Sequence, residues 1–271
     1  MPSNLQQRCL TGSIFIVILA VCILAGHIPF ICLFSVITAM MLYEFYKLAN
    51  ENQSTSIGTY FHSAAGALFF VISSGRLTFI DKRMMLTIGS AYLIYLFTSE
   101  LFRKADNPVK NWAYILLGQI YITLPFILLG LLGSSYDDYN PDLILGLFIL
   151  IWLNDSGAYV VGSTLGRHKL FPRVSPKKTW EGFIGGVVVA MIGGYVLSLF
   201  MTELNIWQWI AFGGTASIFA TLGDLNESLL KRTMGVKDSG NILPGHGGML
   251  DRLDSVLLAC PAIYFLLSII L

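Results

Sequence analysis

The chain has 271 residues, of which 55% are hydrophobic and 12% carry a formal charge, and its mean hydropathy is +0.70. A soluble protein of this length needs far more polar surface, because its outside must face water. The composition therefore excludes an ordinary soluble fold and indicates a membrane protein. The net charge of +1 gives no indication of nucleic-acid binding, so no nucleic-acid partner is predicted.

Near the N-terminus, Arg8 is followed by an apolar run from Ser13, which is the arrangement of a signal peptide. No small-residue cleavage site follows the run, so we predict that it is kept as a first membrane span. Residues 13–43 are apolar throughout, and the turn chemistry of Gly26 to Pro29 divides them into a tight hairpin of two short helices.

Nine apolar segments follow one another along the chain. A bilayer core of ~30 Å needs about 20 apolar residues per helix. On that basis we predict spans near residues 12–26, 29–47, 60–75, 84–102, 112–133, 142–164, 179–200, 206–223 and 253–271. The predicted fold class is all-α, a polytopic integral membrane protein with about nine transmembrane helices.

Charge is distributed very unevenly between these spans. If the connecting segments are assigned alternately to two sides, 14 of the 17 basic residues fall on one side and 3 on the other. Because cytoplasmic loops carry an excess of Lys and Arg, we predict a cytoplasmic N-terminus and an external Leu271. The charged loops at 167–178 and 231–252 then face the cytoplasm, where nucleotides are available. We assign the chain to the bacterial cytoplasmic (inner) membrane.

Acidic residues at membrane depth are the first candidates for function. Asp155 lies inside the apolar run 143–164. A charge at the bilayer centre costs about 2.5–3.5 kcal/mol or more, so a partner or an aqueous cavity is predicted for it. Asp224 ends a later apolar run, and a continuing helix would place Glu227 and Lys231 on the same face.

A basic block with the sequence SPKKTWE occupies residues 175–181. Pro176 suits the first turn of a helix, whose free N–H groups would bind phosphate. The candidate substrate-binding residues of this block are Ser175, Lys177, Lys178, Thr179 and Glu181. From the residues alone, positive-inside charge is the favoured explanation of the two lysines.

Residues 228–255 concentrate charge beside a glycine-rich turn. Cations hold phosphates, carboxylates hold a divalent metal, and glycines let backbone N–H groups approach an anion. The candidates here are Lys231, Arg232, Lys237, Asp238, His246, Gly247, Gly248 and Arg252. Asp224 and Asp251, at two separate helix ends, are the predicted Mg²⁺ ligands. The open alternative is that both acids only form ion pairs with Lys231, Arg232 and Arg252.

The order of residues in this window resembles a family signature. Ser228, Lys231 and Arg232, then Lys237 and Asp238, then Pro244 to Gly248, Asp251, Arg252 and Asp254 match S-x-x-K-R, K-D and P-G-H-G-G-x-x-D-R-x-D. This pattern is similar to that of the phosphatidate cytidylyltransferase, or CDP-diacylglycerol synthase, family. Asn154–Tyr159 and Ser175–Gly182 resemble further family blocks, so the likeness covers roughly the C-terminal half.

The resemblance implies that CMP is transferred from CTP to phosphatidate, giving CDP-diacylglycerol and pyrophosphate for phospholipid biosynthesis. It also implies Mg²⁺, with room for a second cation, contact with membrane lipids, and a homodimer. We assign catalytic roles to Lys231, Arg232, Lys237, Asp238 and His246. We assign substrate binding to Asp155, the 175–181 candidates, Gly247, Gly248 and Arg252.

Two alternatives to this activity stay open. One is a CTP-dependent transferase acting on another lipid phosphate. The other is a transporter, which is disfavoured because the polar chemistry lies in one half only, without matching halves. We therefore divide the chain into scaffold helices, 1–135, and catalytic helices, 136–271. Gly182-x-x-x-Gly186, Gly193-Gly194 and Gly213-Gly214 predict close helix packing in the second part.

Overall fold

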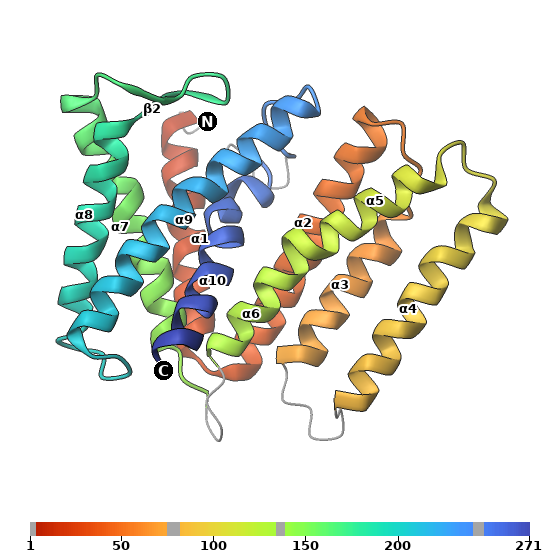
Figure 1. Cartoon of the computed structure of the whole chain (residues 1–271), viewed down its shortest axis with the longest axis horizontal. Coiled ribbons are helices and arrows are strands. Elements are labelled where there is room, and N and C mark those ends of the chain that lie inside the picture. The colour runs from red at the N-terminus through yellow and green to blue at the C-terminus, as the bar shows by residue number, and fades with distance from the viewer. Residues whose placement is uncertain (1–3, 75–81, 134–138, 241–246) are drawn as a thin grey trace. The chain divides into compact units, whose positions relative to one another are not determined.

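Figure 1 shows the computed structural model of the chain, which describes residues 4–74, 82–133, 139–240 and 247–271. These residues are mostly helical, and the sheet among them is a two-stranded hairpin, which confirms the predicted all-α class. The chain divides into two compact units. The first unit is Met1–Leu131 with Ser239–Leu250, and the second unit is Leu132–Asp238 with Asp251–Leu271. The functional division at residue 135 stays a prediction.

The first unit is a set of helices with an aromatic core. Its helices are α1 (Asn4–Leu24), α2 (His27–Asn52), α3 (Thr59–Ser74), α4 (Lys82–Arg103), α5 (Pro108–Gly118), the π-helical turn η1 (Gln119–Thr123) and α6 (Leu124–Leu132). The last three form one continuous helix in Figure 1. Phe34 of α2 packs against Phe30, with ring centroids 4.7 Å apart, and against Phe126 of α6, at 5.8 Å. All three rings are fully buried.

The predicted turn between the first two helices is confirmed, but the helices are not short, since α1 has 21 residues and α2 has 26. Gly26 separates α1 from α2 and has φ +117°, a backbone conformation that glycine adopts without steric cost. α2 then begins at His27, so Pro29 falls in its first turn, where the missing N–H is tolerated.

The second unit carries the charged segments. It consists of α7 (Asp142–Leu165), β1 (Lys169–Phe171), β2 (Ser175–Thr179), α8 (Trp180–Leu197), α9 (Ile206–Thr233) and α10 (Leu250–Ile270), whose first residue belongs to the first unit. β1 and β2 pair antiparallel. α9 begins with a capping box, in which Asn205 and Gln208 satisfy each other's backbone N–H groups.

Glycines let the helices of the second unit pack closely, as predicted. A Cβ on Gly186 would lie 2.5 Å from Asn154 Oδ1, and a Cβ on Gly194 or Gly213 would overlap a backbone carbonyl of the neighbouring helix. Gly214 differs, because a Cβ there would make only ordinary contact with Met191. The packing prediction is therefore confirmed for Gly182, Gly186, Gly193, Gly194 and Gly213, but not for Gly214.

Each of the nine predicted spans lies largely within a helix or continuous helical stretch of the described residues. By length and apolar composition, six of the described helical stretches can cross a membrane: His27–Asn52, Arg83–Arg103, Pro108–Leu132, Asp142–Leu165, Trp180–Leu197 and Leu250–Ile270. α1 has a shorter apolar stretch, Thr11–Leu24, and α3 has 16 residues. α9 is long, but polar and small residues interrupt it. A polytopic membrane protein is supported, and the count of nine stays a prediction.

Candidate active site

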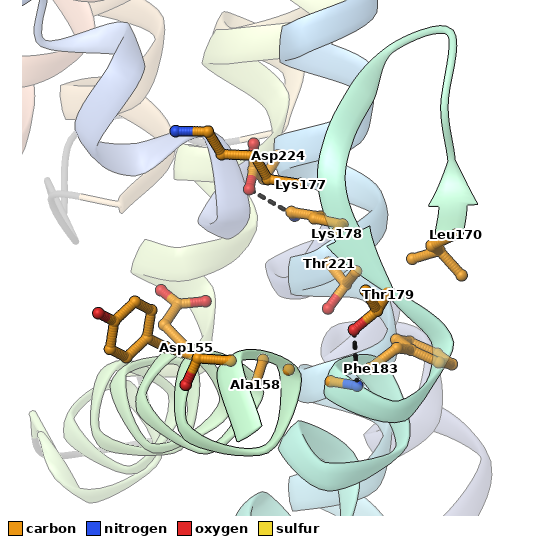
Figure 2. A pocket seen from close by; sticks show the side chains of 13 residues that line it. Asp155, Ala158, Leu170, Lys177, Lys178, Thr179, Phe183, Thr221 and Asp224 are labelled. Carbon is orange, nitrogen blue, oxygen red and sulfur yellow. Dashed lines mark hydrogen bonds and ion pairs between the residues drawn. The ribbon is translucent and has the colours of Figure 1, made fainter. Parts of the chain in front are cut away.

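A cavity of about 430 Å³ lies within the second unit, between α7, the hairpin, α8 and α9. Figure 2 shows its walls, which combine two carboxylates and two lysines with hydroxyl and apolar side chains. The residues that line it are Asp155, Ala158, Tyr159, Gly162, Ser163, Leu170, Lys177, Lys178, Thr179, Gly182, Phe183, Thr221 and Asp224. Four predicted substrate-binding residues therefore meet at this cavity together with the predicted metal ligand Asp224. They are Asp155, Lys177, Lys178 and Thr179.

Helix α7 forms one wall of the cavity, because several of its lining residues lie on the same face of the helix. Asp155, Tyr159 and Gly162 are separated by four and three residues, so they lie on one face of the helix. Asp155 was expected to need a partner or an aqueous cavity, and it lines the cavity. Asn154 Nδ2 also donates a hydrogen bond of 3.2 Å to Asp155 Oδ1.

The basic block forms a strand rather than the start of a helix. We expected Pro176 to begin a helix, and this is wrong, because Ser175–Thr179 pairs with Lys169–Phe171 as strand β2. The helix begins at Trp180, and Thr179 is its N-cap, with Oγ1 accepting a hydrogen bond of 3.2 Å from the Gly182 N–H. The strand alternates its side chains, and both Lys177 and Lys178 still reach the cavity.

Glu181 has a different set of contacts from the lysines before it. Its carboxylate accepts hydrogen bonds from the backbone N–H groups of Arg167, at 3.0 Å, and His168, at 3.2 Å. The His168 ring nitrogen Nδ1 lies 2.6 Å from its Oε1. These contacts hold the turn after α7 against the start of α8. Among the described residues, Glu181 and Ser175 are not part of the cavity lining, and their substrate-binding roles stay predictions.

An excess of negative charge surrounds Asp224. Lys178 Nζ lies 2.5 Å from Asp224 Oδ2, and Figure 2 marks this ion pair. Asp155 and Asp254 both lie close enough to Asp224 and to Lys178 to interact with their charges. Three carboxylates thus lie within the field of Lys178, and Lys177 also lines the cavity. At membrane depth such an arrangement is costly without a further cation.

These side chains fit Mg²⁺ as part of a substrate complex. In the described part of the chain, no group of three or more His, Cys, Asp or Glu side chains is arranged to hold an ion alone. Mg²⁺ does not need such a cage, because it usually binds one or two carboxylates together with water and substrate phosphates. Asp224, with 36% of its side chain exposed, offers oxygen to the cavity.

Asp251, the other predicted metal ligand, takes part in a buried ion-pair cluster. Lys231 Nζ lies 2.6 Å from Asp251 Oδ1 and 2.6 Å from Glu227 Oε2. The three side chains are 13%, 9% and 0% exposed, in the order Lys231, Asp251, Glu227. Burial alone would lower the pKa of the Lys231 ammonium group, but its pairing with Asp251 and Glu227 outweighs burial and raises it. Pairing of the acids with a lysine, the alternative left open by the sequence, is thus observed for Asp251.

The remaining residues of the charged window lie at the end of α9, in the segment that follows it and in α10. Arg232 Nη1 donates a hydrogen bond of 3.3 Å to the Val236 carbonyl, so it closes the C-terminal end of α9. Lys237, Asp238 and Arg252 are exposed. Gly247 and Gly248 belong to the first unit, and Gly247 has φ +83°. His246 lies outside the described residues.

The sequence analysis did not select several residues that the structure brings to the site. Asp254 lies one helical turn after Asp251, and its position in the signature was a usable signal. Tyr159 and Ser163 follow Asp155 at helical spacing, which a projection of α7 from Asp155 would have found. Thr221 precedes Asp224 by three residues in the same way.

Comparison with known proteins extends the likeness to the whole chain. A model of the "Cytidylyltransferase family" matches residues 6–270. The chain is 34% identical over 268 residues to a phosphatidate cytidylyltransferase of Bacillus subtilis (strain 168), covering 98% of each chain. It is 33% identical over 264 residues to one of Staphylococcus haemolyticus (strain JCSC1435), covering 97% of this chain and 99% of that one. The N-terminal half, in which the sequence motifs showed only a series of spans, thus takes part in the similarity.

Proposed function

The chain belongs to the cytidylyltransferase family, and we propose that it transfers CMP from CTP to phosphatidate, giving CDP-diacylglycerol and pyrophosphate. The observation that carries this proposal is full-length similarity to phosphatidate cytidylyltransferases, together with a cavity whose lysines and carboxylates come from the predicted motifs. Nothing in the comparisons favours a transporter or a transferase acting on another lipid phosphate.

The reaction needs alignment and charge neutralisation more than proton transfer. A phosphate oxygen of phosphatidate attacks the α-phosphorus of CTP, the bond from that phosphorus to the bridging oxygen breaks, and pyrophosphate leaves. The attacking oxygen is already anionic near neutral pH, so a strong general base is not required. Lys177 and Lys178 on β2 would hold phosphate oxygens in the cavity and offset the repulsion between two polyanions.

We propose Asp224 as the central Mg²⁺ ligand, because it borders the cavity and lies among excess carboxylates. When bound, Mg²⁺ would neutralise charge on the transferred and leaving phosphates. The second carboxylate is either Asp251, predicted from the sequence, or Asp254, whose charge acts on Asp224. Lys178 then holds Asp224 from the opposite wall, at 2.5 Å. A second cation stays a prediction.

We also propose nine spans in a bacterial inner membrane, with the N-terminus and the charged loops in the cytoplasm. The distribution of 14 against 3 basic residues supports this orientation. Lipid tails would enter from the bilayer and CTP from the cytoplasm. A homodimer is part of the same proposal and rests on the family resemblance alone.

The direct test is the product made by the purified protein in detergent or lipid vesicles. With labelled CTP, Mg²⁺ and phosphatidate, we expect labelled CDP-diacylglycerol and one pyrophosphate for each CMP transferred. Without phosphatidate, no pyrophosphate should form. If the folded protein makes the product only with an isoprenoid-ether phosphate, the lipid assignment is wrong. If it makes no lipid-linked CMP from either lipid, the transfer reaction itself is wrong.

A further inference from the structure

Glu181, the second residue of α8, binds neighbouring residues of the chain and does not line the described cavity. Its Oε2 accepts hydrogen bonds from the backbone N–H groups of Arg167, at 3.0 Å, and His168, at 3.2 Å. The His168 N–H also donates to Oε1 at 3.2 Å, and the ring nitrogen Nδ1 of His168 lies 2.6 Å from the same oxygen. Hydrogen bonds to a carboxylate are stronger than those between neutral groups. Both oxygens of Glu181 are therefore used to hold two consecutive residues.

These contacts close the open end of the β-hairpin. Arg167 and His168 come between α7 and β1, whereas Glu181 follows β2 at the start of α8. The Trp180 N–H also donates to the His168 carbonyl at 2.9 Å, next to the first backbone pair of the hairpin. The carboxylate of Glu181 thus continues the attachment of the two strands beyond their last backbone pair.

The two lysines of the cavity lie in an irregular part of this hairpin. The first residue of each strand pairs with the last residue of the other, so the three residues of β1 lie against the five residues of β2. Lys177 and Lys178 are in the longer strand, between its paired ends, and Figure 2 shows them extending from it into the cavity. Extra residues in one strand bend it and disrupt the ladder. The places of the two ammonium groups therefore depend on how firmly the ends of the strand are held.

The end of α7 packs tightly against the same end of the hairpin. A Cβ on Gly166 would lie 2.8 Å from Thr179 Oγ1, and a Cβ on Gly162 would lie 3.2 Å from the same atom. A Cβ on Gly182 would lie 2.9 Å from the carbonyl oxygen of Ala158. The end of α7, the last residue of β2 and the start of α8 thus form one close-packed joint, which Glu181 ties together.

We propose that Glu181 is a positioning residue for Lys177 and Lys178. By tying residues 167 and 168 to the start of α8, it fixes one end of β2 and so sets where both ammonium groups stand in the cavity. This inference rests on the proposed function, because the proposed reaction brings the phosphates that the two lysines hold. Glu181 then acts on the substrate through the hairpin, in place of the direct contact predicted from the sequence.

Two variants of Glu181 separate positioning from a direct role of its charge. Glu181→Met removes both acceptors and should lower kcat/KM for CMP transfer about 10-fold, the lower range for losing hydrogen bonds to a charged group. In Glu181→Gln the amide oxygen can take the place of Oε2 and accept from both backbone N–H groups, so kcat/KM should stay within about threefold of wild type. If Glu181→Gln is as inactive as Glu181→Met, the carboxylate acts through its charge and the positioning role is wrong.

A double-mutant cycle tests whether Glu181 acts through the two lysines. In a protein that carries Lys177→Met and Lys178→Met, neither ammonium group remains to be positioned. Adding Glu181→Met to this protein should therefore lower the remaining rate of lipid-linked CMP formation by less than about twofold. A further 10-fold loss, about as large as in the wild type, would show that Glu181 acts independently of the lysines and would overturn the proposal.

Hydrogen exchange gives a readout that needs no substrate. In Glu181→Met, the amides of Arg167 and His168 and those of β2 should exchange faster, while those of α9 keep their wild-type rates. Unchanged exchange at residues 167 and 168, or faster exchange throughout the second unit, would overturn the proposal. The matched control is Glu203→Met, in the loop at the other end of α8, where the exposed carboxylate accepts a hydrogen bond of 2.5 Å from Asn140. It should keep wild-type activity and wild-type exchange in the hairpin.

Two outcomes separate this inference from the proposed function. If the wild type transfers no CMP to any lipid phosphate, the proposed function fails, and the exchange rates still decide whether Glu181 holds the hairpin. If the wild type is active and Glu181→Met keeps its kcat/KM, the inference about Glu181 alone fails. Should Glu181→Met not fold, His168→Ala decides the question, because it removes only the contact of a ring that is 79% exposed. It should lower kcat/KM about threefold, the effect of one hydrogen bond, and an unchanged value would overturn the proposal.

Discussion

Two buried carboxylates of the first unit are satisfied by donors of the protein, whereas the second unit also has carboxylates that gather at a cavity. In the first unit, Glu100 accepts hydrogen bonds from Arg103 and Asn111, each 3.0 Å long, and Glu44 accepts hydrogen bonds from Ser239, Met249 and Leu250. In the second unit, Asp224 is 36% exposed at a cavity and shares the field of Lys178 with Asp155 and Asp254. Carboxylates satisfied by donors of the protein hold structure together, whereas carboxylates in excess at a cavity are suited to a ligand.

This comparison predicts the largest effect for Asp224. Asp224→Asn should lower the rate of CMP transfer by about 10³-fold, because a ligand for phosphate-neutralising Mg²⁺ is lost. Its thermal unfolding in detergent should stay close to wild type, since Asn is nearly isosteric. The wild type should also lose its activity in excess chelator and regain it with Mg²⁺.

The matched control is Asp142→Asn, in the first turn of the neighbouring helix α7 and outside the cavity lining. It should keep full activity. Wild-type turnover of Asp224→Asn, or full activity of the wild type in chelator, would show that Asp224 does not hold a metal. In that case the contrast between the two units would lose its functional meaning.

Lys178 should show the next largest effect. Its ammonium group lies 2.5 Å from Asp224, and its removal leaves three carboxylates without their shared lysine. Lys178→Met should therefore lower activity by about 10²-fold, which is the lower range for losing one preorganised charge in an active site.

Lys169→Met, on the paired strand β1 and outside the cavity lining, is the control for a general effect of positive charge. It should stay near wild type. Equal losses in the two variants would indicate that lysines of the hairpin act only as topology signals or lipid contacts, which was the alternative that the sequence left open.

Replacement of Lys231 should mainly lower the stability of the protein, because its ammonium group pairs with two buried carboxylates. Lys231→Met leaves Glu227 and Asp251 without the cation 2.6 Å from each of them. Breaking such a buried cluster costs about 3–5 kcal/mol, so the melting temperature in detergent should fall by several degrees. An unchanged melting temperature with a large loss of activity would instead support the catalytic role predicted from the sequence.

The sequence predicted the helices well because each one is an apolar run of membrane length, bounded by turn chemistry such as that of Gly26. The strand at Ser175–Thr179 was missed. Pro176 reads locally as a helix start, and only the partner strand at Lys169–Phe171 makes it extended. Pairing between segments is a tertiary effect that a local pattern does not contain.

The candidate site was predictable where motif residues share one face of one helix, and not where separate helices meet. Asp155 and Asp224 were found because a charge at membrane depth is itself a signal. The pairing of Lys178 with Asp224, and of Lys231 with Asp251, depends on how β2, α9 and α10 pack. The contacts of Glu44 in the first unit were missed for the same reason, because its partners lie about 200 residues further along the chain.

The smallest expected effect concerns Thr179, which caps a helix and also has a predicted role in substrate binding. It lines the cavity, but its hydroxyl group caps α8 through the Gly182 N–H, and the residue is only 6% exposed. Thr179→Val keeps the shape and removes the cap, so it should cost about 1 kcal/mol of stability, while Thr179→Ser should cost much less. If the hydroxyl is used only as a cap, KM for both substrates should change less than twofold in both variants. A large rise in the KM for CTP in Thr179→Val, with the melting temperature of wild type, would show that the hydroxyl binds substrate directly.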